Sequence, residues 1–201
     1  MTLNHLRSGI LCTLVAGLGL ALPLSGAASA QPAPVAIKMY TPMVSARIEA
    51  VVPDGSQIDI TLAGGQTIHA PVSLYKQVDA AMLAGEKSLY TSLPGPCGES
   101  WVTIGYQNTA FKPYLMSTGF SLSGGKRAVS YDWWVQIDGP DGYNYSWQDD
   151  GGLGLDTSWQ GGYSATGPLG RWSATVDTLS WAVTDTGLVC ESAGPSDSAT
   201  L

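Results

Sequence analysis

Residues 128–147, AVSYDWWVQIDGPDGYNYSW, carry the clearest structural signal in this 201-residue sequence. Between residues 129 and 137, large apolar side chains alternate with other residues, which predicts a strand with one buried and one wetter face. The Gly139-Pro-Asp-Gly142 segment is a strong turn signal, and tyrosine or tryptophan alternates with polar residues after it. The stretch therefore predicts a β-hairpin in a mainly β protein.

Further short strands are predicted on both sides of this hairpin, separated by Gly, Pro and Asp. They cover residues 100–106, 115–122, 153–159, 171–176, 179–184 and 188–191. Eight short strands within about 95 residues indicate an antiparallel β-sandwich over residues 93–192, immunoglobulin-like only in architecture. Residues 193–201 are predicted to form a flexible tail.

Residues 31–92 are predicted to form a small β-meander with one short helix. Strand-like stretches at 44–52, 57–62 and 66–72 are separated by turn-forming residues. Ser73 is the expected N-cap of the helix, and Gly85 is expected to follow its end. The apolar residues that recur on one face of this helix are Leu74, Val78, Ala81 and Met82.

The first thirty residues have the three regions of a cleaved secretory signal peptide. Arg7 precedes an apolar run at 10–22, and the segment ends in Ala28-Ser-Ala30. The run is too short for a membrane-spanning helix, so we expect a secreted protein without a membrane span. In that oxidising compartment the two remaining cysteines, Cys97 and Cys190, are expected to form a disulfide, worth about 4 to 5 kcal/mol by loop-closure entropy.

The charge distribution limits the kinds of partner. The chain has a formal net charge of −7, and from Asp132 onward Arg171 is the single base among many acids. A surface of that sign repels phosphate groups, which excludes nucleic acid as a partner and disfavours anionic membranes. The simplest role of this negative surface charge is to keep the protein soluble.

Few catalytic chemistries fit the sequence. His69 is the single histidine after the signal segment, and no Gly-x-Ser-x-Gly or Walker motif is present. We therefore expect no enzyme, with carboxylate-based glycoside hydrolysis as the remaining catalytic alternative. The carboxylates available for it are Asp149, Asp150, Asp156, Glu99 and Asp138. Asp149, Asp150 and Asp156 could also bind Ca²⁺, although their spacing does not match an EF-hand loop; no other cofactor is expected.

Tryptophan is concentrated in the predicted sandwich, where all seven lie between Trp101 and Trp181. Strand alternation places Trp133 on the buried face and Trp134 on the opposite face, beside Asp132 and Gln136. A tryptophan on a polar strand face can stack on a sugar ring or contact a protein; alternatively, the N-terminal unit covers it.

We expect a ligand site at Trp134, with Gln136 and Asp132 beside it and Trp159 as the second aromatic residue. The predicted function is a secreted, non-catalytic binding module for cell-wall or extracellular glycans. The alternative is an extracellular protein-interaction or structural domain, such as an adhesin, an inhibitor or an envelope component. The sequence predicts no specific ligand beyond these classes.

Overall fold

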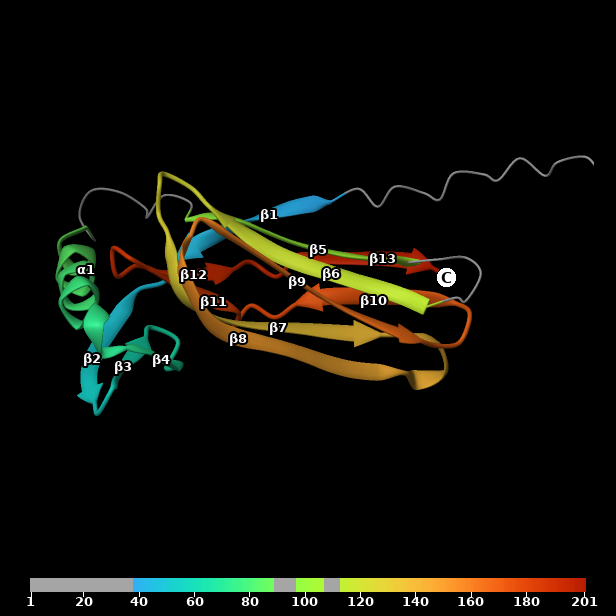
Figure 1. Cartoon of the computed structure of the whole chain (residues 1–201), viewed down its shortest axis with the longest axis horizontal. Helices are drawn as coiled ribbons and strands as arrows, with labels where there is room; N and C mark the ends of the chain where they lie inside the picture. The colour runs from blue at the N-terminus through green and yellow to red at the C-terminus, as the bar shows by residue number, and fades with distance from the viewer. Residues whose placement is uncertain (1–37, 89–96, 107–112) are drawn as a thin grey trace, which may run out of the picture. The chain divides into compact units, whose positions relative to one another are not determined.

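The computed structural model describes residues 38–88, 97–106 and 113–201 (Figure 1). The predicted signal peptide lies outside these ranges. The described residues form a ten-stranded sheet, a three-stranded sheet and one α-helix, so the mainly β fold is confirmed. No helix within the described ranges is long and apolar enough to cross a membrane.

The ten-stranded sheet is antiparallel and runs in the order β13-β10-β7-β11-β12-β1-β5-β6-β9, with β8 paired to β7. Its strands are β1 (Met39–Ser45), β5 (Gly98–Tyr106), β6 (Pro113–Leu122), β7 (Ala128–Asp138), β8 (Asn144–Asp156), β9 (Ser158–Thr166), β10 (Arg171–Val176), β11 (Trp181–Thr184), β12 (Val189–Ser192) and β13 (Ser196–Thr200).

This sheet folds over to make two facing layers, which confirms the predicted sandwich. One edge of β7 pairs with β8, and the other pairs with β10 at one end and β11 at the other. The first layer is therefore β8-β7-β10-β13, and β11 leads from it to the second layer, β12-β1-β5-β6-β9. Between the layers, the Trp133 ring lies 5.2 Å from the Phe120 ring, and Trp133 Nε1 donates a hydrogen bond to Thr118 Oγ1.

The hairpin predicted from residues 128–147 is present as β7 and β8, with Asp138 opposite Asn144. The turn contains Asp141 at φ 56° and Gly142 at φ 77°, left-handed conformations that suit an Asp-Gly pair. Strand β8 continues to Asp156 and β9 begins at Ser158, so the predicted strand at 153–159 is divided between them. Gly151, Gly152 and Gly154 hide this division because glycine contributes no side chain to an alternating pattern.

The three-stranded sheet is the predicted meander with altered boundaries. It consists of β2 (Ile48–Asp54), β3 (Gln57–Leu62) and β4 (Thr67–Pro71). The predicted strand at 44–52 spans the end of β1 and the start of β2, and β1 pairs with β5 and β12 in the large sheet.

The helix also differs from its predicted ends. A 3₁₀ turn at Val72–Leu74 leads into α1 (Tyr75–Ser88). Ser73 lies inside the 3₁₀ turn and not at the N-cap, and the helix continues through Gly85. Leu74 and Val78 are buried as predicted. Packing of this apolar face outweighs the modest helix-breaking tendency of one glycine.

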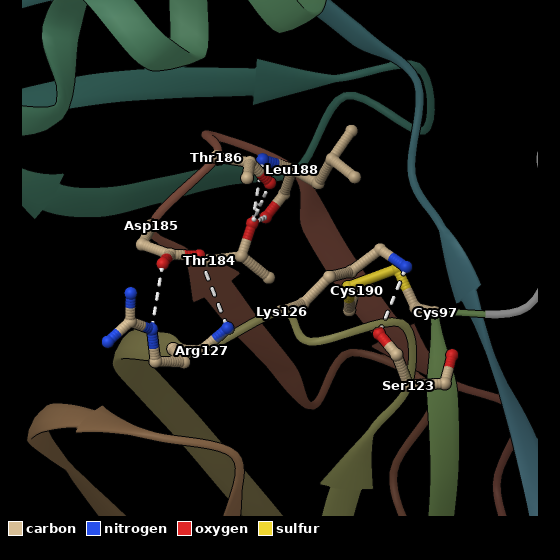
Figure 2. Close-up of a disulfide and its surroundings, with 9 residues drawn as sticks. All are labelled: Cys97, Ser123, Lys126, Arg127, Thr184, Asp185, Thr186, Leu188 and Cys190. Carbon is tan, nitrogen blue, oxygen red and sulfur yellow. Dashed lines mark hydrogen bonds and ion pairs between the residues drawn. A yellow bond between two sulfur atoms is a disulfide. The ribbon is translucent and has the colours of Figure 1, made fainter.

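Cys97 and Cys190 form the predicted disulfide, with their Cα atoms 5.7 Å apart (Figure 2). It ties the residue before β5 to β12. The turn after β6 packs beside it, because Ser123 N donates to Cys97 O at 2.9 Å and Lys126 Nζ donates to Ser123 O at 3.2 Å. A disulfide of this kind is consistent with an oxidising, extracytoplasmic environment.

The prediction of a flexible tail at 193–201 is wrong, because β13 lies within this segment and pairs with β10. Ile104 N also donates to Asp197 Oδ2 at 2.9 Å, which fastens β13 to β5. Residues 196–200 contain little apolar surface, so their strand depends on these backbone and carboxylate hydrogen bonds and not on a hydrophobic pattern.

Candidate functional site

The candidate site lies on the outward-facing side of the layer β8-β7-β10-β13, called here the outer face. Tyr131, Trp133, Val135 and Ile137 are buried under this layer, as the alternation predicts. Trp134 points the other way and remains 36% exposed. Its direct neighbour across the strands is Gln148 of β8.

Trp134 is the most exposed of the seven tryptophans, all of which lie within the described residues. Two others are also outside the central core but are covered. Lys38 Nζ lies 3.6 Å from the centre of the Trp101 ring, and Trp101 is only 5% exposed. Trp181 packs into a second hydrophobic cluster with meander residues such as Ile60 and Ile68. The N-terminal unit thus contacts Trp181, while Trp134 is left open.

The backbone of Trp134 is held by a serine that sequence reasoning missed. Trp134 N donates to Ser180 Oγ at 3.0 Å, and the same hydroxyl donates to Trp134 O at 3.2 Å. Asp177 N also donates to Trp134 O at 2.9 Å. These bonds replace strand pairing at the gap where β10 has ended and β11 has not begun. The backbone that carries the exposed ring is therefore held in place by three hydrogen bonds.

Residues with hydrogen-bonding side chains occupy the positions next to Trp134 on the outer face. Gln148 Nε2 donates to Asp132 Oδ1 at 3.0 Å, so Asp132 lies beside Trp134 as predicted. Gln136, two residues along β7, is half-buried, and its Nε2 has no hydrogen-bond partner among the described residues. Asp150 stands directly opposite Asp132. The structure thus brings together Trp134, Asp132, Gln136 and Gln148.

Trp159, the second predicted ligand residue, lies elsewhere. Its ring packs at the edge of the core. The centre of the ring lies 4.6 Å from the centre of the Tyr131 ring and 5.8 Å from that of the Trp133 ring. Its role as a ligand residue stays a prediction, but it does not share a surface with Trp134.

An aromatic seam joins the two edge strands β8 and β9, which do not pair with each other in the sheet. The Tyr145 and Tyr163 rings stack with their centres 4.8 Å apart, and the Trp147 and Trp159 rings stack with their centres 6.3 Å apart. Burial, together with the neighbouring tyrosines Tyr145 and Tyr143, raises the pKa of Tyr163. The alternation of tyrosine and tryptophan after the turn was the available signal, but their partners on β9 could not be read from the sequence.

The carboxylates predicted to bind calcium do not converge. Asp149 points inward and accepts a 3.0 Å hydrogen bond from the Tyr131 hydroxyl, whereas Asp150 points outward. Asp156 ends β8 opposite Ala128. The segment is a strand and not a loop, so consecutive carboxylates face opposite ways. Among the described residues no three metal-ligating side chains form a cluster.

The remaining candidates for catalysis are also separated. Glu99 lines a depression of about 250 Å³ with Tyr40, Pro42, Gly98 and Ser123, and no second carboxylate is part of that described lining. Asp138 accepts a 2.7 Å hydrogen bond from Asn144 Nδ2 at the hairpin end.

His69 is exposed on the meander, where its Nδ1 lies 2.8 Å from Asp59 Oδ1. No nucleophilic serine hydroxyl is hydrogen-bonded to its ring within the described part of the chain.

Comparison with protein-family models, with curated proteins and with solved structures finds no match to this chain.

Proposed function

We propose that this chain is a secreted, non-catalytic glycan-binding module whose site is centred on Trp134. The observation that carries the proposal is an indole ring left 36% exposed on an open strand face, with its backbone fixed by Ser180. A sugar ring presents C–H groups on its face and hydroxyls at its edge. A rigid aromatic ring bordered by hydrogen-bonding groups complements both parts.

The surroundings of Trp134 favour a sugar over a protein partner. Protein hot spots usually occupy a desolvated pocket enclosed by other contacts. Here the side chains that border the ring are Asp132, Gln136 and Gln148, which offer carboxylate and amide groups for hydroxyls. The acidic side chains on this face also oppose anionic ligands, in keeping with the overall charge of −7.

The test is a binding assay on insoluble cellulose, insoluble chitin and purified bacterial cell wall, with wild-type protein and a Trp134→Ala variant. Loss of a central aromatic contact costs about 2 kcal/mol or more, which is roughly a thirtyfold loss of affinity. Tyr40→Ala is the matched control, because Tyr40 is 53% exposed but lies on β1 in the other layer. Absence of binding to all three materials, or full binding by Trp134→Ala, would contradict the proposal.

A further inference from the structure

A continuous row of uncharged polar side chains crosses the outer face beside Trp134. Ser146 of β8 is opposite Gln136 of β7, which is opposite Thr175 of β10, which in turn is opposite Ser196 of β13. Directly opposed residues on neighbouring strands project from the same face of a sheet. These four residues are called the polar row. Trp134 borders it, two positions from Gln136 along β7.

The dimensions of the polar row suit an extended ligand. Neighbouring strands are about 4.8 Å apart, so three spacings make the row about 14 Å long. Ser146, Thr175 and Ser196 are exposed, and each carries a hydroxyl that both donates and accepts. A single sugar ring on Trp134 would use only the nearest of these groups.

Gln136 supplies an observation that points to a ligand. Its Nε2 is buried and has no hydrogen-bond partner among the described residues. A buried amide without a partner costs about 1 to 3 kcal/mol. A small rotation of the Gln136 side chain toward the surface would let this amide donate to a ligand hydroxyl and remove that cost.

The charges around the row limit the chemistry of the ligand. The row itself is uncharged. The carboxylates of Asp132 and Asp138 lie on either side of it along β7, and Arg171, four residues from Thr175 on β10, is the single base on the strands of this layer. Gln148 and Asn144 each donate to one of these carboxylates. An anionic chain along the row would face two carboxylates, whereas a neutral chain rich in hydroxyls would face donors and acceptors.

We propose, as an extension of the glycan-binding function, that the ligand is a neutral polysaccharide that lies along the polar row, across the strands. One sugar ring stacks on Trp134. Neighbouring sugar units donate to and accept from Ser146, Gln136, Thr175 and Ser196. The site therefore recognises the interior of a chain and not a single terminal sugar.

The test is calorimetric titration with neutral cello-, xylo-, manno- and chito-oligosaccharides of one to six units, and with oligogalacturonates as the anionic series. We expect affinity for one neutral series to rise with length and then level off when the row is filled. The double variant Ser146→Ala/Ser196→Ala removes the hydroxyls at the two ends of the row. It should lower the affinity for the longest neutral oligosaccharide about tenfold, since each lost hydrogen bond costs about 0.5 to 1.5 kcal/mol.

The matched control is Ser121→Ala/Ser158→Ala. These two exposed serines form an opposed pair on β6 and β9, in the other layer, and their removal should leave affinity unchanged. Binding that requires Trp134 but shows no dependence on length or on the row variants would overturn this inference and leave the proposed function standing. Tighter binding of oligogalacturonates would overturn it too, and absence of binding to every glycan would overturn both proposals.

Discussion

Trp133 and Trp134 are adjacent in the sequence, but replacing Trp133 with alanine should cost far more stability than replacing Trp134. Trp133 is fully buried, lies 5.2 Å from Phe120 by ring centres, and donates from Nε1 to Thr118. Trp133→Ala therefore leaves a cavity in the core and removes a buried hydrogen bond. We expect a loss of about 3 to 5 kcal/mol in the free energy of unfolding.

Trp134→Ala removes a ring that is 36% exposed on the outer face, where polar residues occupy the neighbouring positions of β7 and β8. Its stability cost should be about 1 kcal/mol, within the range of cross-strand pair contributions. Chemical denaturation followed by tryptophan fluorescence and circular dichroism gives both values. If Trp133→Ala does not fold, Trp133→Phe should still lose more stability than Trp134→Ala. Equal losses of stability would show that both faces of β7 are buried, which would contradict a ligand site at Trp134.

Three further predictions concern the scaffold. Replacing both Cys97 and Cys190 with serine should lower the free energy of unfolding by about 2 to 5 kcal/mol, measured by denaturation, and a loss near zero would mean that the bridge does not restrain the unfolded chain. Ser180→Ala leaves the part-buried Trp134 N–H without its partner and should lower the free energy of unfolding by about 1 kcal/mol, with Ser158→Ala as the exposed control. Burial, reinforced by the hydrogen bond to Asp149, raises the pKa of Tyr131 from 10.0 to about 12. Because the folded state keeps this proton to a higher pH than the unfolded state, the associated stability is complete below pH 10 and is lost as the pH rises toward 12. The free energy of unfolding of the wild-type protein should therefore fall by about 2 kcal/mol between pH 10 and pH 12, and a Tyr131→Phe variant with the same pH dependence over that range would contradict this prediction.

The parts of the fold that were predictable are those with a local side-chain pattern. β3 and β10 have the predicted ends, and the β7–β8 hairpin has the predicted turn, because alternation and turn residues are encoded within a few positions. The disulfide followed from the number of cysteines and the compartment. The structure shows the same pairing.

The parts that were not predictable depend on contacts between distant residues. β13 has a polar sequence and exists through its pairing with β10 and the bond from Ile104 to Asp197. The stacking of Tyr145 on Tyr163 requires the two layers to meet at β8 and β9. Gly151, Gly152 and Gly154 hide the alternation of β8, which turns Asp149 and Asp150 to opposite faces, so the sequence did not show that these carboxylates diverge.

The candidate site was predictable in part for the same reason. Alternation along β7 is local, so the direction of Trp134 and its neighbours Asp132 and Gln136 could be predicted from the sequence. Ser180, which fixes the Trp134 backbone, lies 46 residues away and became visible only in the folded chain. The polar row likewise requires the strand order β8-β7-β10-β13, which no local pattern specifies.

The assignment of the site to Trp134 is tested by an NMR titration of the tryptophan indole N–H signals with a soluble oligosaccharide from the neutral series that binds. Trp133 Nε1 is engaged by Thr118, and Trp172 Nε1 donates to the carbonyl of Pro168 at 3.1 Å, so both should stay unchanged. The Trp134 signal should shift first and furthest, and the shift should saturate with ligand. A titration that moves the Trp147 or Trp159 signal while Trp134 stays fixed would place the ligand at the aromatic seam and contradict the assignment of the site to the outer face.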